Sequence, residues 1–444
     1  MAIARVLVLG AGFIAGPLVR YFFEQPEIEI KIGDASVSKA EDLVRGHPRG
    51  KTLEIDLRDE ERLKKEVVQS DLVISLVPYV FHPLVARVCI ASHKNMVTTS
   101  YVSDAMNKLD PAAREAGVTI LNEVGLDPGI DHMEAMRIIH RLREEGGEVL
   151  GFISYCGGLP APEANTNPFG YKFSWSPRGV LLAGTNSARY LKDGVEIFVP
   201  SRDLFDHYFP ILIKGLPDFE GYPNRDSIPY VDLYGIPETR TMIRGTLRYP
   251  GWCETLKKIV DLGLLGQEAV AWSGGTISGF LRTLSAVPES EDIERAVGKR
   301  LNLAPGSPIM ERLRWLGLFG DEPVPPKKIA PLDVLEVLMS KKLRYEKDER
   351  DLVVLRHEFT ARVSGRTERI VSTLTAFGIP GGDSAMARTV GLPAAVGGRL
   401  ILEKKITRTG ICAPVCPDIY GPILTELKSH GIDFSEERER IGEA

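Results

Sequence analysis

The sequence has few cysteines and no long apolar run, and both absences narrow the class of protein. Its five cysteines are an odd number in 444 residues, unlike the dense, even sets that crosslink small secreted domains. No apolar run reaches the roughly 18 residues that a membrane-spanning helix needs. The N-terminus also lacks a signal-peptide pattern. We therefore expect a cytoplasmic protein that does not bind membranes.

Positive charge is not in excess either, which bears on the partners. The 55 Lys and Arg residues are outnumbered by 60 Asp and Glu residues, and the net charge is −5. Because nucleic acids are bound by clustered basic side chains, we expect no nucleic-acid partner. Cys412 and Cys416 lack the spacing of zinc ligands, so we expect no metal. Small molecules are the expected partners.

The first 130 residues alternate short apolar runs with helical patterns. Arg5–Gly10, Glu29–Gly33 and Asp71–Val77 are typical of strands, whereas Pro83–Ser92 has the periodicity of a helix. Such alternation predicts a parallel sheet covered by helices on both faces. At this chain length, two or three domains are expected in total.

The remaining sequence predicts a mixed second domain interrupted by helices. Val149–Tyr155 is typical of a strand, and residues 251–343 show helical periodicity with almost no strand signal. Leu352–Val363 and Glu368–Phe377 predict a β-hairpin with a four-residue loop. The last residues, Glu436–Ala444, are expected to form a charged tail.

A glycine motif marks a dinucleotide site at the end of the first strand. Gly10, Gly12 and Ala15 form Gly-x-Gly-x-x-Ala between a strand and a helix, where pyrophosphate binds at the helix N-terminus. Asp34 lies 22 residues beyond Gly12, where a carboxylate can accept hydrogen bonds from the adenosine ribose. It favours NAD, with NADP as the alternative. The expected cofactor-binding residues are Gly10, Gly12, Phe13, Ile14, Asp34, Ser36, Ser75, Val77 and Pro78.

Three longer strings are more specific than the glycine motif. Gly125–His132, Ser154–Glu163 and Ile243–Tyr249 resemble the saccharopine dehydrogenase family of the glutamate-forming kind. The resemblance implies a Rossmann domain, a mixed α+β substrate and dimerisation domain, and a helical insertion. With the patterns above, it places the first at residues 1–130 joined by 385–444, the second at 131–250 and 344–384, and the third at 251–343.

The resemblance also implies an activity. The family carries out NAD(P)-dependent oxidative cleavage of saccharopine to L-glutamate and 2-aminoadipate 6-semialdehyde, or the reverse condensation, in lysine metabolism. We therefore expect an oxidoreductase that acts on a CH–NH bond of saccharopine and forms a homodimer. Because no lysine-ketoglutarate reductase half precedes residue 1, a stand-alone enzyme is expected.

The family motifs suggest which residues carry the chemistry. The resemblance implicates Asp127, Cys156 and Tyr101 in catalysis, and we expect them to influence proton movement. Saccharopine has three carboxylates, and the planar guanidinium of arginine can bind a carboxylate with two hydrogen bonds. The resemblance points to Arg225 and Arg244 for this purpose, with Asn224, Thr246 and Trp175 as further substrate-binding residues.

The sequence leaves three alternatives open. Cys156 could be the covalent nucleophile of a semialdehyde dehydrogenase. A related enzyme could act on another amine, in which case Arg225 or Arg244 would be dispensable. A protein of another class could hold NAD as a non-catalytic sensor.

Overall fold

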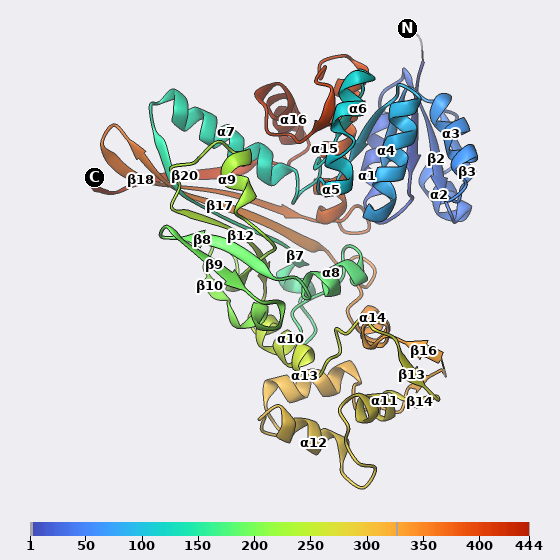
Figure 1. Ribbon diagram of the computed structural model, residues 1–444, viewed down its shortest axis with the longest axis vertical. Helices are drawn as coiled ribbons and strands as arrows, with labels where there is room; N and C mark the ends of the chain where they lie inside the picture. The colour runs from blue at the N-terminus through green and yellow to red at the C-terminus, as the bar shows by residue number, and fades with distance from the viewer. Residues whose placement is uncertain (1–2, 326, 444) are drawn as a thin grey trace. The chain divides into compact units, whose positions relative to one another are not determined.

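The computed structural model describes residues 3–325 and 327–443, and its chain forms two compact units (Figure 1). The first unit contains the residues up to Val149 together with those from Thr360 onward. The second unit contains Leu150–Phe359. The three-part division expected from the sequence remains a prediction.

The first unit contains a seven-stranded sheet in which all neighbouring strands are parallel. Its order, β19-β6-β5-β4-β1-β2-β3, places β1 beside β4, where the strand order reverses and dinucleotides bind. Val6 to Leu9 are at most 1% exposed, as expected for a strand covered on both faces. The strands are β1 (Ala4–Leu9), β2 (Ile28–Asp34), β3 (Gly50–Glu54), β4 (Leu72–Ser75), β5 (Asn95–Thr98), β6 (Thr119–Leu121) and β19 (Gly410–Cys412).

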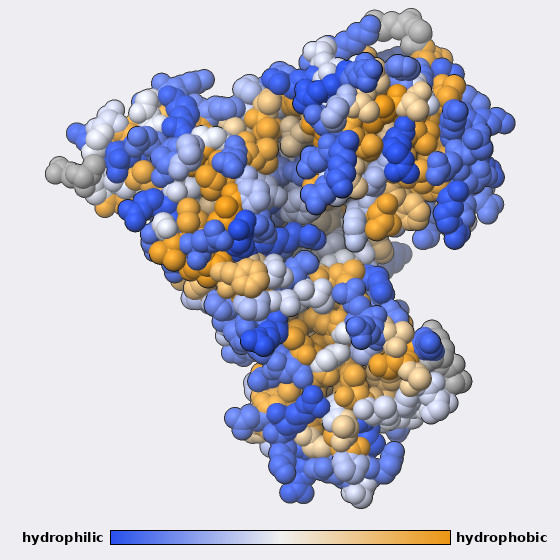
Figure 2. Space-filling view, in the orientation of Figure 1, coloured by the Kyte–Doolittle hydropathy of each residue, from blue (hydrophilic) through white to orange (hydrophobic). Residues whose placement is uncertain are grey.

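The helices of this unit pack their apolar faces toward the sheet. In α3, Leu63 and Val67 are buried one turn apart, whereas hydrophilic side chains cover the surface around α2 and α3 (Figure 2). Helices α15 and α1 approach closely at Gly391, where an added Cβ would lie 2.6 Å from the backbone oxygen of Ile14. The helices are α1 (Ala15–Phe23), α2 (Val37–Val44), α3 (Glu60–Val68), α4 (His82–Ala91), α5 (Asp104–Asn107), α6 (Asp110–Glu115), α7 (Ile130–Glu144), α15 (Ala385–Leu402) and α16 (Pro417–Ser429), with a short 3₁₀ helix, η1 (Tyr79–Phe81).

A second, nine-stranded sheet is mixed, which confirms the predicted fold class. Its main order is β10-β11-β12-β7-β17-β18-β20, with β8 paired to β12 and β9 paired to β8. β12 runs parallel to β7 and antiparallel to β11. The strands are β7 (Glu148–Pro160), β8 (Ala188–Lys192), β9 (Val195–Val199), β10 (Phe209–Ile211), β11 (Phe219–Pro223), β12 (Thr241–Arg248), β17 (Asp351–Val363), β18 (Arg366–Phe377) and β20 (Phe434–Glu443).

The remaining elements of the second unit are mostly helical. Several begin after a Ser, Thr or Asp whose side chain accepts a backbone N–H of the first turn, such as Thr276, Asp292 and Ser307. The helices are α8 (Pro177–Ala183), α9 (Pro229–Leu233), α10 (Trp252–Asp261), α11 (Ile277–Leu284), α12 (Ile293–Arg300), α13 (Pro308–Leu316) and α14 (Pro331–Lys342), with the 3₁₀ helices η2 (Pro162–Ala164) and η3 (Ser201–Asp206). Among the described residues, no helix is both long and apolar enough to cross a membrane.

Several local expectations were wrong. The hairpin loop has two residues rather than four, because Ser364 and Gly365 both adopt positive φ (49° and 74°), as in a type I′ turn. Residues 251–343 also contain strands of two or three residues, too short to give a periodic signal. They are β13 (Val270–Trp272), β14 (Gly275–Thr276), β15 (Pro323–Val324) and β16 (Lys327–Ile329).

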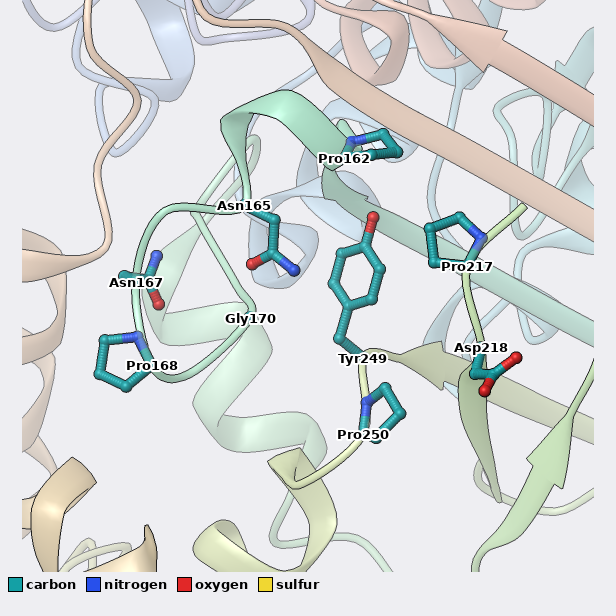
Figure 3. A pocket seen from close by; sticks show the side chains of 9 residues that line it. All are labelled: Pro162, Asn165, Asn167, Pro168, Gly170, Pro217, Asp218, Tyr249 and Pro250. Atoms are coloured by element: carbon teal, nitrogen blue, oxygen red, sulfur yellow. The ribbon is translucent and has the colours of Figure 1, made fainter. Parts of the chain in front are cut away.

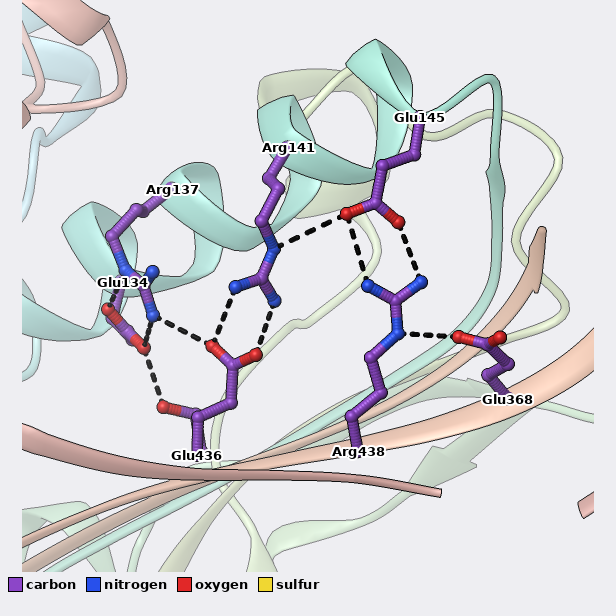
Figure 4. A network of polar contacts seen from close by, with 8 residues as sticks. Glu134, Arg137, Arg141, Glu145, Glu368, Glu436 and Arg438 are labelled. Atoms are coloured by element: carbon purple, nitrogen blue, oxygen red, sulfur yellow. Dashed lines mark hydrogen bonds and ion pairs between the residues drawn. The ribbon is translucent and has the colours of Figure 1, made fainter. Parts of the chain in front are cut away.

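The expected charged tail is an ordered strand, β20, held by ion pairs. Glu436 of β20 lies 2.5 Å from Arg141 and 3.0 Å from Arg137, both on α7. Arg438 of β20 pairs with Glu145 at 2.6 Å and with Glu368 of β18 at 2.5 Å (Figure 4). The charged residues that suggested a tail therefore form ion pairs that hold the C-terminal strand in the first unit.

Candidate active site

The glycine loop lies at the carboxyl end of β1. Gly10 has φ +104°, and an added Cβ would lie 2.9 Å from the backbone oxygen of Leu76. Only glycine fits there without strain. At Gly12 an added Cβ would meet no atom within 4 Å. Because α1 begins at Ala15 immediately afterwards, a ligand phosphate could approach the backbone and the helix N-terminus.

Asp34, at the end of β2, is tied to this loop. One carboxylate oxygen accepts the Ala11 N–H at 2.8 Å, and the other accepts the Ser36 N–H at 2.8 Å. The Ser36 hydroxyl lies 3.0 Å from that of Ser38. Asp34 therefore braces the glycine loop through its own hydrogen bonds, a function that a ribose-binding carboxylate does not require.

Large apolar side chains are exposed around the same loop. Phe13, directly after Gly12, is 72% exposed, and Tyr79 and Val80, directly after Pro78, are 69% and 60% exposed. Exposed apolar side chains beside a ligand loop offer surface that a bound ligand can cover. Tyr79 and Val80 were missed from the sequence, although their position next to Pro78 at the end of β4 was a usable signal. Ile14 is partly buried, as is Val77.

Tyr101 and Asp127 form a hydrogen-bonded pair at this edge of the sheet. The tyrosine hydroxyl donates to Asp127 Oδ1 at 2.7 Å. Asp127 lies in the turn after β6, where Gly129 has φ +148° and an added Cβ would lie 2.1 Å from the Gly125 oxygen. The turn can therefore form only with glycine at 129, and it holds the carboxylate beside the tyrosine.

Glu123 and His132 form a buried pair that contacts the segment after Tyr101. Both are buried, at 6% and 0% exposure. Glu123 accepts the backbone N–H of Val102 at 2.7 Å, and its other oxygen lies 2.8 Å from His132 Nε2. Because both are enclosed, they brace the segment rather than face a ligand.

Cys156, Thr246 and Arg244 belong to the second unit, on neighbouring strands. Thr246 of β12 is paired with Cys156 of β7, and Arg244 is paired with Ser154. Since side chains alternate between the faces of a strand, these three share one face of the sheet. Arg244 is 6% exposed and stacks on Tyr230, with its guanidinium carbon 4.1 Å from the ring centroid.

Arg248 lies on the same face and was missed from the sequence. It is 5% exposed, and its guanidinium stands 4.8 Å from the Tyr171 ring centroid and 5.3 Å from that of Trp252. One nitrogen donates to the Leu247 carbonyl at 2.7 Å. It lies two positions after Thr246 on the strand, a period-two relation that places both side chains on one face.

The other predicted substrate residues lie in loops of this unit. Asn224, partly buried, donates its backbone N–H to the Arg244 carbonyl at 2.8 Å. Arg225 is exposed and has φ +57°. Trp175 is partly buried just before α8, where an added Cβ at Gly179 would lie 2.5 Å from its ring.

A pocket of about 420 Å³ in the second unit is separate from these residues (Figure 3). Its wall contains four prolines, Tyr249, Asp218 and two asparagines, and no predicted site residue. The Tyr249 hydroxyl donates to the Pro160 carbonyl at 3.0 Å. Among the described residues, no group of acidic, His or Cys side chains could hold a metal ion.

The parallel sheet with its glycine loop and the Tyr101–Asp127 pair define a nicotinamide-dependent oxidoreductase. Two family models match the chain: Saccharopine dehydrogenase NADP binding domain over residues 6–121, and Saccharopine dehydrogenase C-terminal domain over residues 125–432. The chain belongs to the saccharopine dehydrogenase family. These findings confirm the prediction of an oxidoreductase of this family.

Individual relatives agree with the family models. The chain is 41% identical to the L-glutamate-forming, NADP(+) saccharopine dehydrogenase of Saccharomyces cerevisiae, covering 97% of this chain and 98% of the relative. It is 40% identical to the mitochondrial alpha-aminoadipic semialdehyde synthase of Bos taurus, covering 97% of this chain and 47% of that protein. The solved structure of apo saccharopine dehydrogenase (L-Glu forming) from S. cerevisiae has a TM-score of 0.89 at 39% identity, covering 98% of this chain and all of that one.

The expected preference for NAD is not supported by these comparisons. The matching N-terminal family model is named for NADP binding, and the saccharopine dehydrogenases of S. cerevisiae and Schizosaccharomyces pombe carry NADP(+) in their names. One Asp34 oxygen accepts the Ala11 N–H of the glycine loop and the other accepts the Ser36 N–H, so this carboxylate has a structural role whichever cofactor binds. Its presence at the end of β2 therefore did not identify the cofactor.

Proposed function

We propose that this protein catalyses the nicotinamide-dependent oxidative cleavage of saccharopine to L-glutamate and 2-aminoadipate 6-semialdehyde, or the reverse condensation. The Tyr101–Asp127 pair at the carboxyl edge of the dinucleotide-binding sheet carries this proposal. Identity of about 40% with saccharopine dehydrogenases over nearly the full chain supports the choice of substrate.

In this proposal the first unit handles the proton. A nicotinamide cofactor held at the glycine loop by the Gly10 and Gly12 backbone would supply hydride acceptance from the carbon beside the saccharopine nitrogen. That nitrogen must lose its proton first, and Asp127 is the acceptor. The hydrogen bond from Tyr101 holds the Asp127 carboxylate in place. After water has added to the imine, Asp127 returns its proton to the nitrogen, which leaves as the amine of glutamate.

The second unit binds the carboxylates. Arg244 and Arg225 each bind one carboxylate, and Thr246 and Asn224 supply further hydrogen bonds. Trp175 forms a wall of the site. Cys156, which shares a sheet face with Arg244, assists proton transfer without forming a covalent bond to substrate.

We propose NADP as the preferred form of the cofactor. Gly12 leaves open space for the pyrophosphate, and the exposed Phe13 and Tyr79 offer apolar surface to the bases. The Ser36 and Ser38 hydroxyls, 3.0 Å apart, are placed to donate to a 2′-phosphate, and Lys39 follows them in the sequence.

The test is to mix purified protein with saccharopine and follow nicotinamide absorbance separately with NADP and NAD. We expect reduction of NADP at the higher kcat/KM, with glutamate released in equal amount. Higher kcat/KM with NAD would overturn the cofactor assignment, and absence of glutamate with both would overturn the reaction.

A cytoplasmic location, a homodimer and the three-domain division are further parts of the proposal. All five cysteines are free thiols, which fits a reducing compartment. The mass of the protein in solution tests the dimer. Limited proteolysis tests the division, with first cuts expected near residues 250 and 343.

A further inference from the structure

The His82 side chain lies buried where β4 and β5 end, among three hydroxyl groups. Its Nδ1 is 2.9 Å from Ser75 Oγ. Its Nε2 is 2.8 Å from Ser100 Oγ and 3.2 Å from Thr98 Oγ1. His82 is 2% exposed and lies at the start of α4. One imidazole thus joins the ends of two neighbouring strands and the segment that follows the second.

These partners lead directly to the two proposed binding regions. Ser75 closes β4, where the nicotinamide ribose is expected. Ser100 immediately precedes Tyr101, whose hydroxyl donates to Asp127. A shift of the Ser100 segment would therefore move the tyrosine relative to its carboxylate partner.

We infer that His82 is a positioning residue: it holds the Ser100–Tyr101 segment for proton transfer through Nε2, and holds Ser75 beneath the cofactor through Nδ1. This inference rests on the proposed function. His82 does not touch the reacting atoms.

The neutral imidazole suits this task. Burial lowers the pKa of His82 to about 4, so the ring is uncharged near neutral pH and has one N–H donor and one acceptor nitrogen. The nitrogen that carries hydrogen donates to its serine, and the other accepts from its serine. The serine that accepts from the ring N–H keeps its own hydroxyl hydrogen for another acceptor, whereas the other serine uses its hydrogen on the ring.

A purely apolar side chain would fill the same space without the cost of burying polar groups. A buried polar group is retained at little cost only when it is hydrogen-bonded. Here both ring nitrogens have hydroxyl partners from segments 7 to 18 residues away. The hydrogen bonds link separate segments and fix the orientation of their hydroxyl groups, which apolar packing alone would not do.

Two substitutions separate the two halves of the inference. In His82→Asn the amide can replace Nδ1 and keep Ser75, but it cannot reach Ser100. In His82→Gln the amide can replace Nε2 and keep Ser100. We expect His82→Asn to lower kcat about 10- to 100-fold, the scale for misplaced catalytic groups, with the KM for NADP nearly unchanged. We expect His82→Gln to keep kcat within about threefold and to raise the KM for NADP.

Controls separate positioning from folding. His93→Asn changes an exposed histidine of the same unit and should leave both constants unchanged. Ser100→Ala should reproduce the kcat loss of His82→Asn, and the double variant should lose no more than either single one, because both remove the same link. The Ser100 variant tests the idea even if His82→Asn does not fold.

Equal kinetic effects of the Asn and Gln variants, or additive losses in the double variant, would overturn the inference. If the unsubstituted protein did not turn over saccharopine, the proposed function would fail separately. NADPH binding by fluorescence would then decide the Ser75 half: weaker binding by His82→Gln than by His82→Asn supports it, and equal binding overturns it.

Discussion

The two units hold their polar site residues by different physical means. In the first unit, Tyr101, Asp127 and His82 are joined to neighbours by short hydrogen bonds between neutral or anionic groups. In the second, Arg244 and Arg248 are buried cations whose guanidinium groups lie over aromatic rings. The first arrangement holds polar groups at hydrogen-bonding distance from their partners, and the second places positive charge in a region poor in water.

This difference bears on the chemistry that each unit can support. An aromatic face stabilises a guanidinium without neutralising it, so stacking on Tyr230 leaves the positive charge of Arg244 in place. Electrostatic attraction is stronger there than in bulk water, because the effective dielectric constant is lower. A hydrogen-bonded carboxylate such as Asp127 is suited to accept a proton at a fixed place. The comparison predicts that loss of the Asp127 carboxylate lowers kcat, whereas loss of the Arg244 guanidinium raises the KM for saccharopine.

The largest effect is expected for Asp127→Asn. The amide keeps the shape of the side chain but cannot accept the substrate proton, so kcat should fall about 10²- to 10⁴-fold, the range for general acid–base groups. The KM for saccharopine should change little. Steady-state rates at saturating NADP measure both constants, and Asp104→Asn, at an exposed aspartate of the same unit, is the matched control. A kcat within threefold of the original would rule out Asp127 as the proton acceptor.

The next effect is expected for Arg244→Met, which keeps much of the side-chain volume but removes the charge. Removing one partner of a buried charged pair costs about 2–5 kcal/mol, so kcat/KM for saccharopine should fall at least about 30-fold. The KM for NADP should stay constant. Arg240→Met serves as the control, because Arg240 is exposed just before the same strand. A lower kcat with an unchanged KM for saccharopine would contradict the proposal that Arg244 binds a substrate carboxylate.

A smaller effect is expected for Cys156→Ser. A residue that only assists proton movement can be replaced by a hydroxyl with a loss of activity of about 10- to 100-fold, which is below the range of about 10²- to 10⁴-fold for a general acid or base. A covalent nucleophile would leave no measurable turnover when removed. Single-turnover absorbance with saccharopine and NADP distinguishes these outcomes, and abolition of hydride transfer would favour the semialdehyde dehydrogenase alternative.

The sequence predicted the parts of the fold that have local signals. Gly10 and Gly12 lie between a strand and a helix, and the alternating pattern around them is repeated along the first unit, so that sheet could be inferred. The role of His82 could not be inferred, because in the sequence it is a single polar residue at the start of an apolar helix, and its partners lie in other segments. For Arg248, the alternation along β12 indicates its face, but the contacts of its guanidinium with Tyr171 and Trp252 arise only through folding.

The C-terminal strand shows the same limit most clearly. Residues Glu436 to Glu443 have the composition of a solvated tail, but their partners on α7 lie nearly 300 residues earlier in the chain. A periodic pattern within a short stretch of sequence cannot predict ion pairs between such distant residues. The loop of the preceding hairpin was also misjudged, because Arg366 and Thr367 continue the strand and only Ser364 and Gly365 form the turn.

The smallest effect is expected for Arg438→Gln, which tests stability in the first unit without touching either site. The hydrogen bond from Arg438 lowers the pKa of the Glu145 carboxyl. A carboxyl whose pKa is lower in the folded state adds stability above its unfolded value, about 4.3, and loses it as the pH falls through the folded value. The exposed Arg438–Glu145 pair contributes about 0–1 kcal/mol. The substitution also removes the partner of Glu368, which is 8% exposed, so the total effect lies toward the upper end of that range.

We therefore expect Arg438→Gln to lower Tm by about 1–3 °C at pH 7 and by less at pH 3.5, with kcat and both KM values unchanged. Differential scanning calorimetry at the two pH values measures this difference. Arg202→Gln removes an exposed pair with Asp203 and should shift Tm at neither pH. A fall in kcat for the Arg438 variant would show that α7 and β20 influence the Tyr101–Asp127 pair. The ion-pair network could then not be regarded as separate from the proton-transfer site.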